Sequence, residues 1–183
     1  MASLVNLCLY ELGWFACVLG AAGQRPWFGM AFGLAFLGIH LALLRGVGRQ
    51  LALIVVAGAI GLVADSLLMS WGILRYRNGI LVAWLAPPWD VVLWLQFATI
   101  LPFCLRWLSR RYWLCAVAGL VGGPLAFYAG ERLGAVTFLP PRLPHYAALA
   151  VVWSVAMPAL VWVSDRLVVI PGIGNRYRWL SKF

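Results

Sequence analysis

The chain has 183 residues, of which 64% are hydrophobic and 10% are charged. An ordinary soluble domain is about 45–50% apolar and about 25% charged, so the composition excludes a soluble fold. The net charge of +9 does not indicate nucleic acid, because the basic residues lie between apolar runs or in the tail and leave no basic helix face free for a duplex. We therefore expect membrane lipids as partners and no nucleic acid; other membrane subunits are compatible with the same composition.

Several apolar runs approach the roughly 20 residues that cross a bilayer core, and none shows the alternation of a barrel strand. The sequence predicts an all-α fold, a polytopic membrane helical bundle of about six transmembrane helices in a single integral membrane domain, residues 1–183. The expected helices are 2–22, 27–44, 51–74, 88–107, 112–129 and 145–163, followed by a basic tail, 164–183. Residues 80–86 are apolar but too short to span, so we expect an interfacial or re-entrant segment before the fourth helix. The tail is typical of a headgroup anchor.

The first two predicted helices carry one carboxylate and a pattern of small residues. Glu11 falls near the middle of the bilayer. A stripe of mostly small or polar residues lies about 100° away from it, formed by Asn6, Tyr10, Gly13, Cys17 and Gly20. In the second helix, Gly29 and Gly33 form a small-xxx-small pair that predicts close helix packing, and His40 follows on the same face.

The third predicted helix places Asp65 inside a segment otherwise suited to hydrocarbon. A charged Asp at the centre of a membrane helix costs about 2.5–3.5 kcal/mol, so a partner, a proton or water must offset the cost. Gly58, Gly61 and Gly72 share the face of Asp65 at helical spacing, which indicates packing against other helices.

Proline and glycine mark the next two helices. Pro88 suits the first turn of the fourth helix, and Asp90 suits the positive end of its dipole. Pro102 predicts a kink near the end of this helix. The run Gly122-Gly123-Pro124 predicts a kink or break in the fifth helix.

The carboxylates indicate where chemistry could occur. Four of the five acidic residues fall in the predicted outer half of the bilayer, which favours a polar pocket open toward the outer leaflet. The candidate catalytic residues are Asp65, Asp90 and Glu131, and the candidate substrate-binding residues are Glu11, Trp89, Tyr128 and Trp94. Neighbouring carboxyl groups in a low dielectric divide into one that stays protonated and one that is charged, which equips them for acid and base work.

The acidic candidates also have a purely structural interpretation. Asp65 could accept a hydrogen bond from a Tyr or Trp, and a protonated Glu11 could bond a neighbouring helix. Asp90 could be only a helix N-terminal residue, and Glu131 only an interfacial partner of Arg132. His40 fits a packing role, because no second histidine lies near it.

The sequence contains no phosphate loop, no Ser-His-Asp order and no metal cluster. Its four cysteines lack metal-ligand spacing, and its two histidines are too few for a di-iron box. We therefore expect no metal and no cofactor.

Basic residues predict the orientation. With six helices, one side carries Arg45, Arg49, Arg106, Arg110, Arg111, Arg166, Arg176, Arg178 and Lys182, and the other carries Arg25, Arg75, Arg77, Arg132 and Arg142. This asymmetry favours a multi-pass protein of the bacterial inner membrane with both termini cytoplasmic. A spanning 80–86 segment would break that parity.

Several stretches together resemble the domain of unknown function 2878 family, namely Gly13-Trp14-Phe15-Ala16-Cys17, the Asp65 helix, Pro88-Trp89 through Trp94 and Phe97, and Gly122 through Gly134. The resemblance covers most of the chain and implies a small proteobacterial inner-membrane protein without an established activity. A much weaker likeness is to lysoplasmalogenase-type membrane hydrolases, carried by residues 64–69 and 163–167. Against it, the chain has fewer helices, and Asp65 and Asp165 are expected at opposite depths.

Three functions remain open from the sequence. The first is an intramembrane enzyme that acts on a lipid or other hydrophobic substrate by acid/base chemistry, of hydrolase or isomerase type. The second is a small-molecule binding or transport subunit without catalysis. The third is a non-catalytic membrane scaffold.

Overall fold

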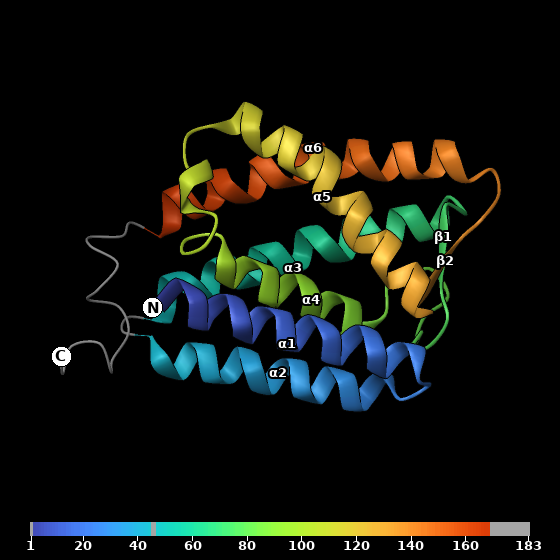
Figure 1. Ribbon diagram of the computed structural model, residues 1–183, viewed down its shortest axis with the longest axis horizontal. Coiled ribbons are helices and arrows are strands. Elements are labelled where there is room, and N and C mark those ends of the chain that lie inside the picture. Colours follow the sequence, from blue (N-terminus) through green and yellow to red (C-terminus); the bar gives the residue numbers. More distant parts are fainter. Residues whose placement is uncertain (1, 45–46, 169–183) are drawn as a thin grey trace.

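The computed structural model describes residues 2–44 and 47–168. Within these residues the chain forms six helices that run back and forth along one axis (Figure 1): α1 (Ala2–Ala22), α2 (Pro26–Leu43), α3 (Val47–Ser70), α4 (Pro88–Ile100), α5 (Tyr112–Leu133) and α6 (Arg142–Leu167). All of them except α4 are long and apolar enough to cross a membrane. The predicted all-α membrane bundle is confirmed. The predicted headgroup anchor lies outside the described residues from position 169 onward, and residues 164–167 form the last turn of α6.

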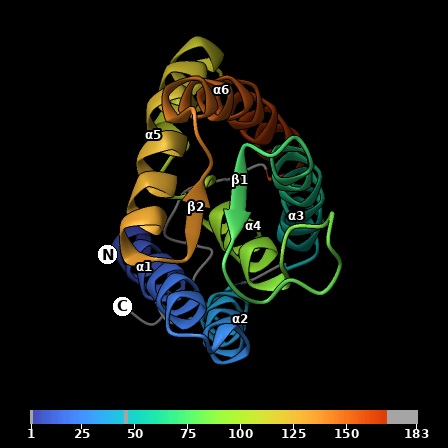
Figure 2. The same cartoon turned by 90° about the vertical axis from the view of Figure 1, so that its right-hand side faces the viewer.

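Helix α4 lies inside the bundle. Viewed along the helix axes in Figure 2, the other helices surround it. It packs against α1, α2 and α3, while α5 pairs mainly with α6 and α3 also contacts α6. Most of its residues are buried, so this short helix has the environment of a protein core rather than of lipid.

Small residues set the spacing of α1 and α2, as the sequence predicts. A side chain on Gly29 would collide with the backbone of α1 at Ala16, and one on Gly33 would collide with Cys17. The predicted stripe on α1 is its packed face, because Asn6 and Cys17 are fully buried there.

Two helix boundaries differ from prediction because of proline and glycine. The fourth helix was expected to reach residue 107 but ends at Ile100, since Pro102 has no backbone N–H to continue the helical hydrogen bonds; turns and a short 3-10 helix, η1 (Arg106–Leu108), follow. The fifth helix is not broken at Pro124 and continues to Leu133. It ends where Gly134 adopts a left-handed conformation, φ +93°, which glycine tolerates best.

The smaller differences are at the other ends. Helix α3 begins and ends four residues earlier than expected, and α6 extends beyond 145–163 in both directions. Residues 80–86, expected to be interfacial or re-entrant, form bends and turns that lead from the end of α3 to α4. Leu81 and Trp84 are largely exposed there, which fits an interfacial segment.

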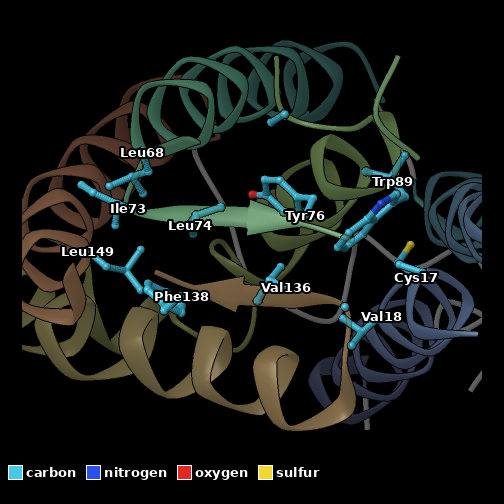
Figure 3. Close-up of a cluster of buried hydrophobic side chains, with 14 residues drawn as sticks. Cys17, Val18, Leu68, Ile73, Leu74, Tyr76, Trp89, Val136, Phe138 and Leu149 are labelled. Atoms are coloured by element: carbon cyan, nitrogen blue, oxygen red, sulfur yellow. The ribbon is translucent and has the colours of Figure 1, made fainter. Parts of the chain in front are cut away.

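A two-stranded antiparallel sheet, which the sequence did not predict, closes one end of the bundle. Strand β1 (Leu74–Tyr76) follows α3, and strand β2 (Val136–Phe138) follows α5. Leu74 pairs with Phe138 and Tyr76 with Val136, and these four side chains are buried. Figure 3 shows them in one apolar cluster with Trp89 and Leu149, so the sheet ties the end of α3 to the end of α5.

Candidate active site

Asp65 is held by the glycine face of α3. One turn earlier, Gly61 lets the indole of Trp94 lie directly against the α3 backbone, because a Cβ atom there would overlap the ring. Gly58 allows the same close approach to Leu95. Through Gly58 and Gly61, the face predicted from the sequence packs α3 on α4, and Asp65 is fully buried in that contact. Gly72 was expected on this face but is not part of it, because α3 ends at Ser70 and Gly72 lies in the turn that follows, with φ +70°.

Trp94 is the direct partner of Asp65. Its indole Nε1–H donates a hydrogen bond of 2.6 Å to Asp65 Oδ2. The indole also stacks on Trp153 of α6, with ring centroids 4.6 Å apart and planes inclined by 21°. A hydrogen bond this short fits a charged acceptor, so the contact stabilises negative charge on Asp65.

Asp90 brings a second carboxyl group to the same place. It lies in the first turn of α4, one turn before Trp94, and only 4% of its surface is exposed. The carboxyl groups of Asp65 and Asp90 are close enough to interact directly. Asp90 is therefore both the helix N-terminal residue expected from its position and half of a buried carboxyl pair.

Tyr76 of β1 is the third polar group of this cluster. Its ring meets Trp89 edge-on at 5.5 Å, and its hydroxyl lies near the Asp90 carboxyl group. Burial, reinforced by the two carboxyl groups, raises the pKa of Tyr76 well above its usual value. The phenol consequently keeps its proton and is available as a donor.

Several polar atoms of this cluster are unsatisfied. Within the part of the chain that the structure describes, Asp65 Oδ1, Asp90 Oδ2 and the Tyr76 hydroxyl are buried without a hydrogen-bond partner. No Lys or Arg among these described residues pairs with either carboxyl group. Most buried polar groups are satisfied and most buried charges are paired, so this concentration of exceptions is typical of a functional site.

A cavity of about 60 Å³ lies next to the pair, between α1, α4 and α5. Asp90 is the carboxyl group that lines it, whereas Asp65 lies behind Asp90 and Trp94. The walls are mostly apolar, and half of the lining residues are aromatic: Tyr10, Trp14, Trp89, Trp94, Phe97, Phe127 and Trp153. The cavity is only partly enclosed. The arrangement places one carboxyl group at the wall of a small, apolar cavity and a second carboxyl group directly behind it.

The remaining candidates from the sequence lie elsewhere. Glu131 accepts hydrogen bonds from the Tyr146 hydroxyl (2.8 Å) and the Phe138 backbone amide (3.1 Å), and forms an ion pair with Arg142 at 3.3 Å. Its charged partner is Arg142 rather than the neighbouring Arg132. Glu131 thereby joins the end of α5 to β2 and to the start of α6.

Tyr128 and Glu11 also lie outside the carboxyl cluster. Tyr128 is 51% exposed, and Glu11 is exposed on α1. The structure thus brings together Asp65, Asp90 and Trp94, with Trp89 on the same cavity, and separates them from the other three candidates.

Tyr10, Tyr76 and Trp153 belong to the cavity or to the cluster but were not among the candidate site residues from the sequence. Tyr76 sits in a basic, aromatic segment that reads as an interfacial belt. Only the pairing of β1 with β2, sixty residues further along the chain, turns its side chain inward. A helical pattern carries no signal for such a contact.

A separate polar network lies toward the opposite end of the bundle. The Asn6 side-chain amide contacts His40 Nδ1 at 2.9 Å and Thr99 Oγ1 at 3.4 Å, linking α1, α2 and α4. This agrees with a packing role for His40. In the residues described by the structure, no group of three or more His, Cys, Asp or Glu side chains could hold a metal ion.

A larger hollow, about 300 Å³, opens at that same end beside Arg106, Arg110 and Asp165. Asp165 accepts hydrogen bonds from the Ser109 hydroxyl at 2.7 Å and from the Arg110 amide at 3.1 Å. Because α3 and α6 are antiparallel and both residues lie near the C-terminal ends of their helices, Asp65 and Asp165 lie toward opposite ends of the bundle (Figure 1). The depth difference expected from the sequence therefore holds.

Comparison with known proteins identifies the family to which this chain belongs. The family described as "Protein of unknown function (DUF2878)" matches residues 3–159. No curated protein and no solved structure matches the chain, so the likeness to lysoplasmalogenase-type hydrolases has no support. The match includes α1 to α5, both strands, the carboxyl pair and most of α6. The chain belongs to the DUF2878 family.

Proposed function

We propose that this membrane protein is an intramembrane enzyme that acts on a lipid or other hydrophobic substrate, with the Asp65–Asp90 pair as its acid and base. The observation that carries the proposal is the placement of the pair: both carboxyl groups are buried together, and one of them lines an apolar cavity. Intramembrane acidic groups are functional by default.

The two carboxyl groups have different surroundings, which assigns them different roles. Asp65 accepts the Trp94 hydrogen bond and is where negative charge is best stabilised. Asp90 then carries the proton that the pair shares, and it carries it at the cavity wall. Asp90 is the group that reaches substrate, so it gives a proton as the acid and takes one back as the base, and Asp65 accepts a proton only through Asp90 while it holds the negative charge. Hydrolysis and isomerisation both need a proton given and a proton accepted at the substrate.

The proposed route for substrate is from the lipid, between α1 and α5. Both helices contribute apolar or aromatic cavity residues, such as Trp14 and Phe127, and the recess is partly open. A cavity of this size admits the reacting group only, so the hydrocarbon chain stays among the lipids. Glu131, Tyr128 and Glu11 lie outside this machinery. Glu131 instead supports it indirectly, through β2.

We place the protein in the bacterial inner membrane with both termini cytoplasmic. The starts of α1, α3 and α5 lie at one end of the bundle and the two strands at the other (Figure 1). In the sequence, nine Lys and Arg residues belong to the side of the first end, against five on the side of the strands, and the positive-inside rule assigns the side with more of them to the cytoplasm. The carboxyl pair then lies in the outer half of the bilayer.

The test is conversion of lipids by purified protein. Wild-type protein, Asp65→Asn and Asp90→Asn are each incubated with a total bacterial lipid extract, and products are followed by mass spectrometry. Loss of a general acid or base typically lowers a rate by about 10²–10⁴-fold, and we expect a loss of that size in both variants. Asp165→Asn is the matched control, because this aspartate lies at the other end, and it should keep full turnover. Wild-type activity that survives in a folded Asp90→Asn protein would contradict the proposal.

A binding or transport subunit is the second candidate, and the aromatic walls of the cavity favour it. Half of the lining residues are aromatic and one is a carboxyl group without a basic partner among the described residues. Such a recess can hold a ligand without transforming it. This candidate predicts a ligand that copurifies and raises the unfolding temperature, with no product from any lipid fraction.

A further inference from the structure

We propose that the cavity takes an organic ammonium group, carried by an amphiphile that enters from the lipid between α1 and α5. The inference rests on the site of the proposed function and names its ligand class. Three observations support it: the net charge of the carboxyl pair, the aromatic walls and the size of the recess.

The first observation concerns charge. Two carboxyl groups in one low-dielectric site share a proton and keep one negative charge between them. The described residues provide no Lys or Arg beside Asp65 or Asp90 to balance that charge. The Trp94 and Tyr76 side chains are neutral donors, which disperse a charge but do not cancel it. One monovalent cation in the cavity would make the site neutral, which a hydrocarbon environment strongly favours.

The second observation concerns the walls. Aromatic rings attract cations through the negative potential of their faces, and quaternary ammonium groups are the ligands that clusters of such rings recognise. The rings here are held in a fixed array: Trp94 stacks on Trp153 at 4.6 Å, and Phe97 meets Trp153 edge-on at 5.6 Å. A neutral polar ligand would find few hydrogen-bonding partners on such walls, whereas an ammonium group needs none beyond the rings and Asp90.

The third observation concerns size and access. A cavity of about 60 Å³ has room for roughly four to six water-sized groups. A methylated ammonium head is of this size, and an acyl chain or a phosphate-bearing headgroup is not. The cation therefore occupies the recess, and its hydrocarbon tail lies along the lipid-facing surfaces of α1 and α5. Asp90 lines the recess and is the one acidic residue there that is available to the head.

The test compares three probes on the purified protein in a maltoside detergent, which carries no ammonium group. The probes are decyltrimethylammonium, decyldimethylamine oxide and tetramethylammonium, and binding is followed by intrinsic tryptophan fluorescence. The amine oxide matches the first probe in tail and head size but has no net charge. We expect decyltrimethylammonium to bind at least tenfold more tightly than the amine oxide, and tetramethylammonium to bind more weakly than both.

Variants locate the effect. The double variant Asp65→Asn/Asp90→Asn removes the charge of the pair and should bring the two decyl probes to equal affinity, and retained binding of the amine oxide shows that its cavity is intact. Phe127→Leu removes one aromatic wall and should reduce the preference for the cation severalfold. Phe32→Leu is the matched control, since Phe32 is exposed on α2 away from the cavity, and it should bind like wild type.

The outcomes separate the ligand from the reaction. Equal affinity of wild-type protein for the two decyl probes would overturn the inference without the need for any variant. Tetramethylammonium binding as tightly as the decyl cation would overturn the claim that the ligand is an amphiphile. Cation preference without turnover of any lipid supports the inference about the ligand and contradicts the proposed enzymatic function. Turnover of uncharged lipids without cation preference supports the enzymatic function and contradicts the inference about the ligand.

Discussion

At the residue scale, two stacked indoles differ in what their N–H groups do. Trp94 donates to Asp65 at 2.6 Å, whereas Trp153 Nε1 is buried with no hydrogen-bond partner among the described residues. Both rings are confined by helix glycines, Trp94 by Gly61 and Trp153 by Gly119 and Gly123. The chain thus offers two nearly equivalent rings, only one of which is bonded to the carboxyl pair.

This contrast gives a prediction about stability. Trp94→Phe keeps an aromatic ring but removes the donor to Asp65, while Trp153→Phe removes a donor that has no partner in the described chain. Because a hydrogen bond to a charged group contributes about 1.5–3 kcal/mol, we expect Trp94→Phe to lower the free energy of unfolding by about 1–2 kcal/mol more than Trp153→Phe. Unfolding by SDS titration in maltoside micelles measures the difference. Equal losses would mean that Asp65 does not depend on its indole donor.

Part of the site could be predicted residue by residue. Helical spacing identifies the glycine face that holds Asp65, since Gly58, Gly61 and Asp65 lie on one helix. The partner of Asp65 could not be predicted in this way, because it depends on which helix packs on that face. Nothing in the sequences of α3 and α4 indicates that the two helices are in contact. The separation of Glu131 from the pair has the same cause: similar depth in a bilayer does not imply proximity within it.

At the element scale, Glu131 connects three elements. The helix end at Gly134 turns the chain directly into β2, whose Phe138 amide returns to the Glu131 carboxylate. Tyr146 reaches the same carboxylate from the first turns of α6. Arg142 is 66% exposed, so its ion pair contributes little beside these two hydrogen bonds.

Removal of the Glu131 side chain should therefore loosen this junction. Glu131→Ala leaves the Phe138 amide and the Tyr146 hydroxyl without their acceptor, and we expect a loss of about 1–3 kcal/mol in the free energy of unfolding. Hydrogen exchange at the Phe138 amide should accelerate as well. Arg132→Gln is the control, since Arg132 is adjacent and exposed and forms no ion pair in the part of the chain described. A loss in Arg132→Gln equal to that in Glu131→Ala would contradict this account.

Elements differ in how far local sequence determines them. Long apolar runs place the helices, since burial in lipid leaves the helix as the solution for a single segment. Pro102 and Gly134 explain two helix ends after the fact, although each residue type also occurs inside helices of this protein. Strands β1 and β2 have three residues each. Three residues are too few for the alternation of buried and exposed side chains to predict a strand. The pairing of the two strands also joins segments that no periodic pattern connects.

At the scale of the whole molecule, the two ends of the bundle differ in chemistry. One end carries the sheet, the interfacial segment 80–86 and the nearby carboxyl pair. The other carries the 3-10 helix and the cluster of arginines around it. The sequence predicts the part of this asymmetry that depends on basic residues, because alternating helices assign each loop to a side, but it does not predict the sheet.

The orientation is testable with single cysteines at two exposed tryptophans. Trp84 lies in the segment before α4 and is 63% exposed, and Trp107 lies in η1 at the opposite end and is 58% exposed. We expect a membrane-impermeant maleimide to label Trp84→Cys on intact spheroplasts and Trp107→Cys only after the membrane is opened. Wild-type protein gives the background from the native cysteines. The reverse pattern would place the carboxyl pair in the inner leaflet.

The enclosed position of α4 has a consequence for biosynthesis. A helix of 13 residues extends about 20 Å, less than the roughly 30 Å of hydrocarbon, and this one also carries Asp90 and Gln96. Such a segment would leave the translocon poorly if it met only lipid. Its principal neighbours, α1, α2 and α3, all precede it in the chain. These three helices have therefore already been synthesised when α4 emerges from the ribosome, and α4 can pack against them.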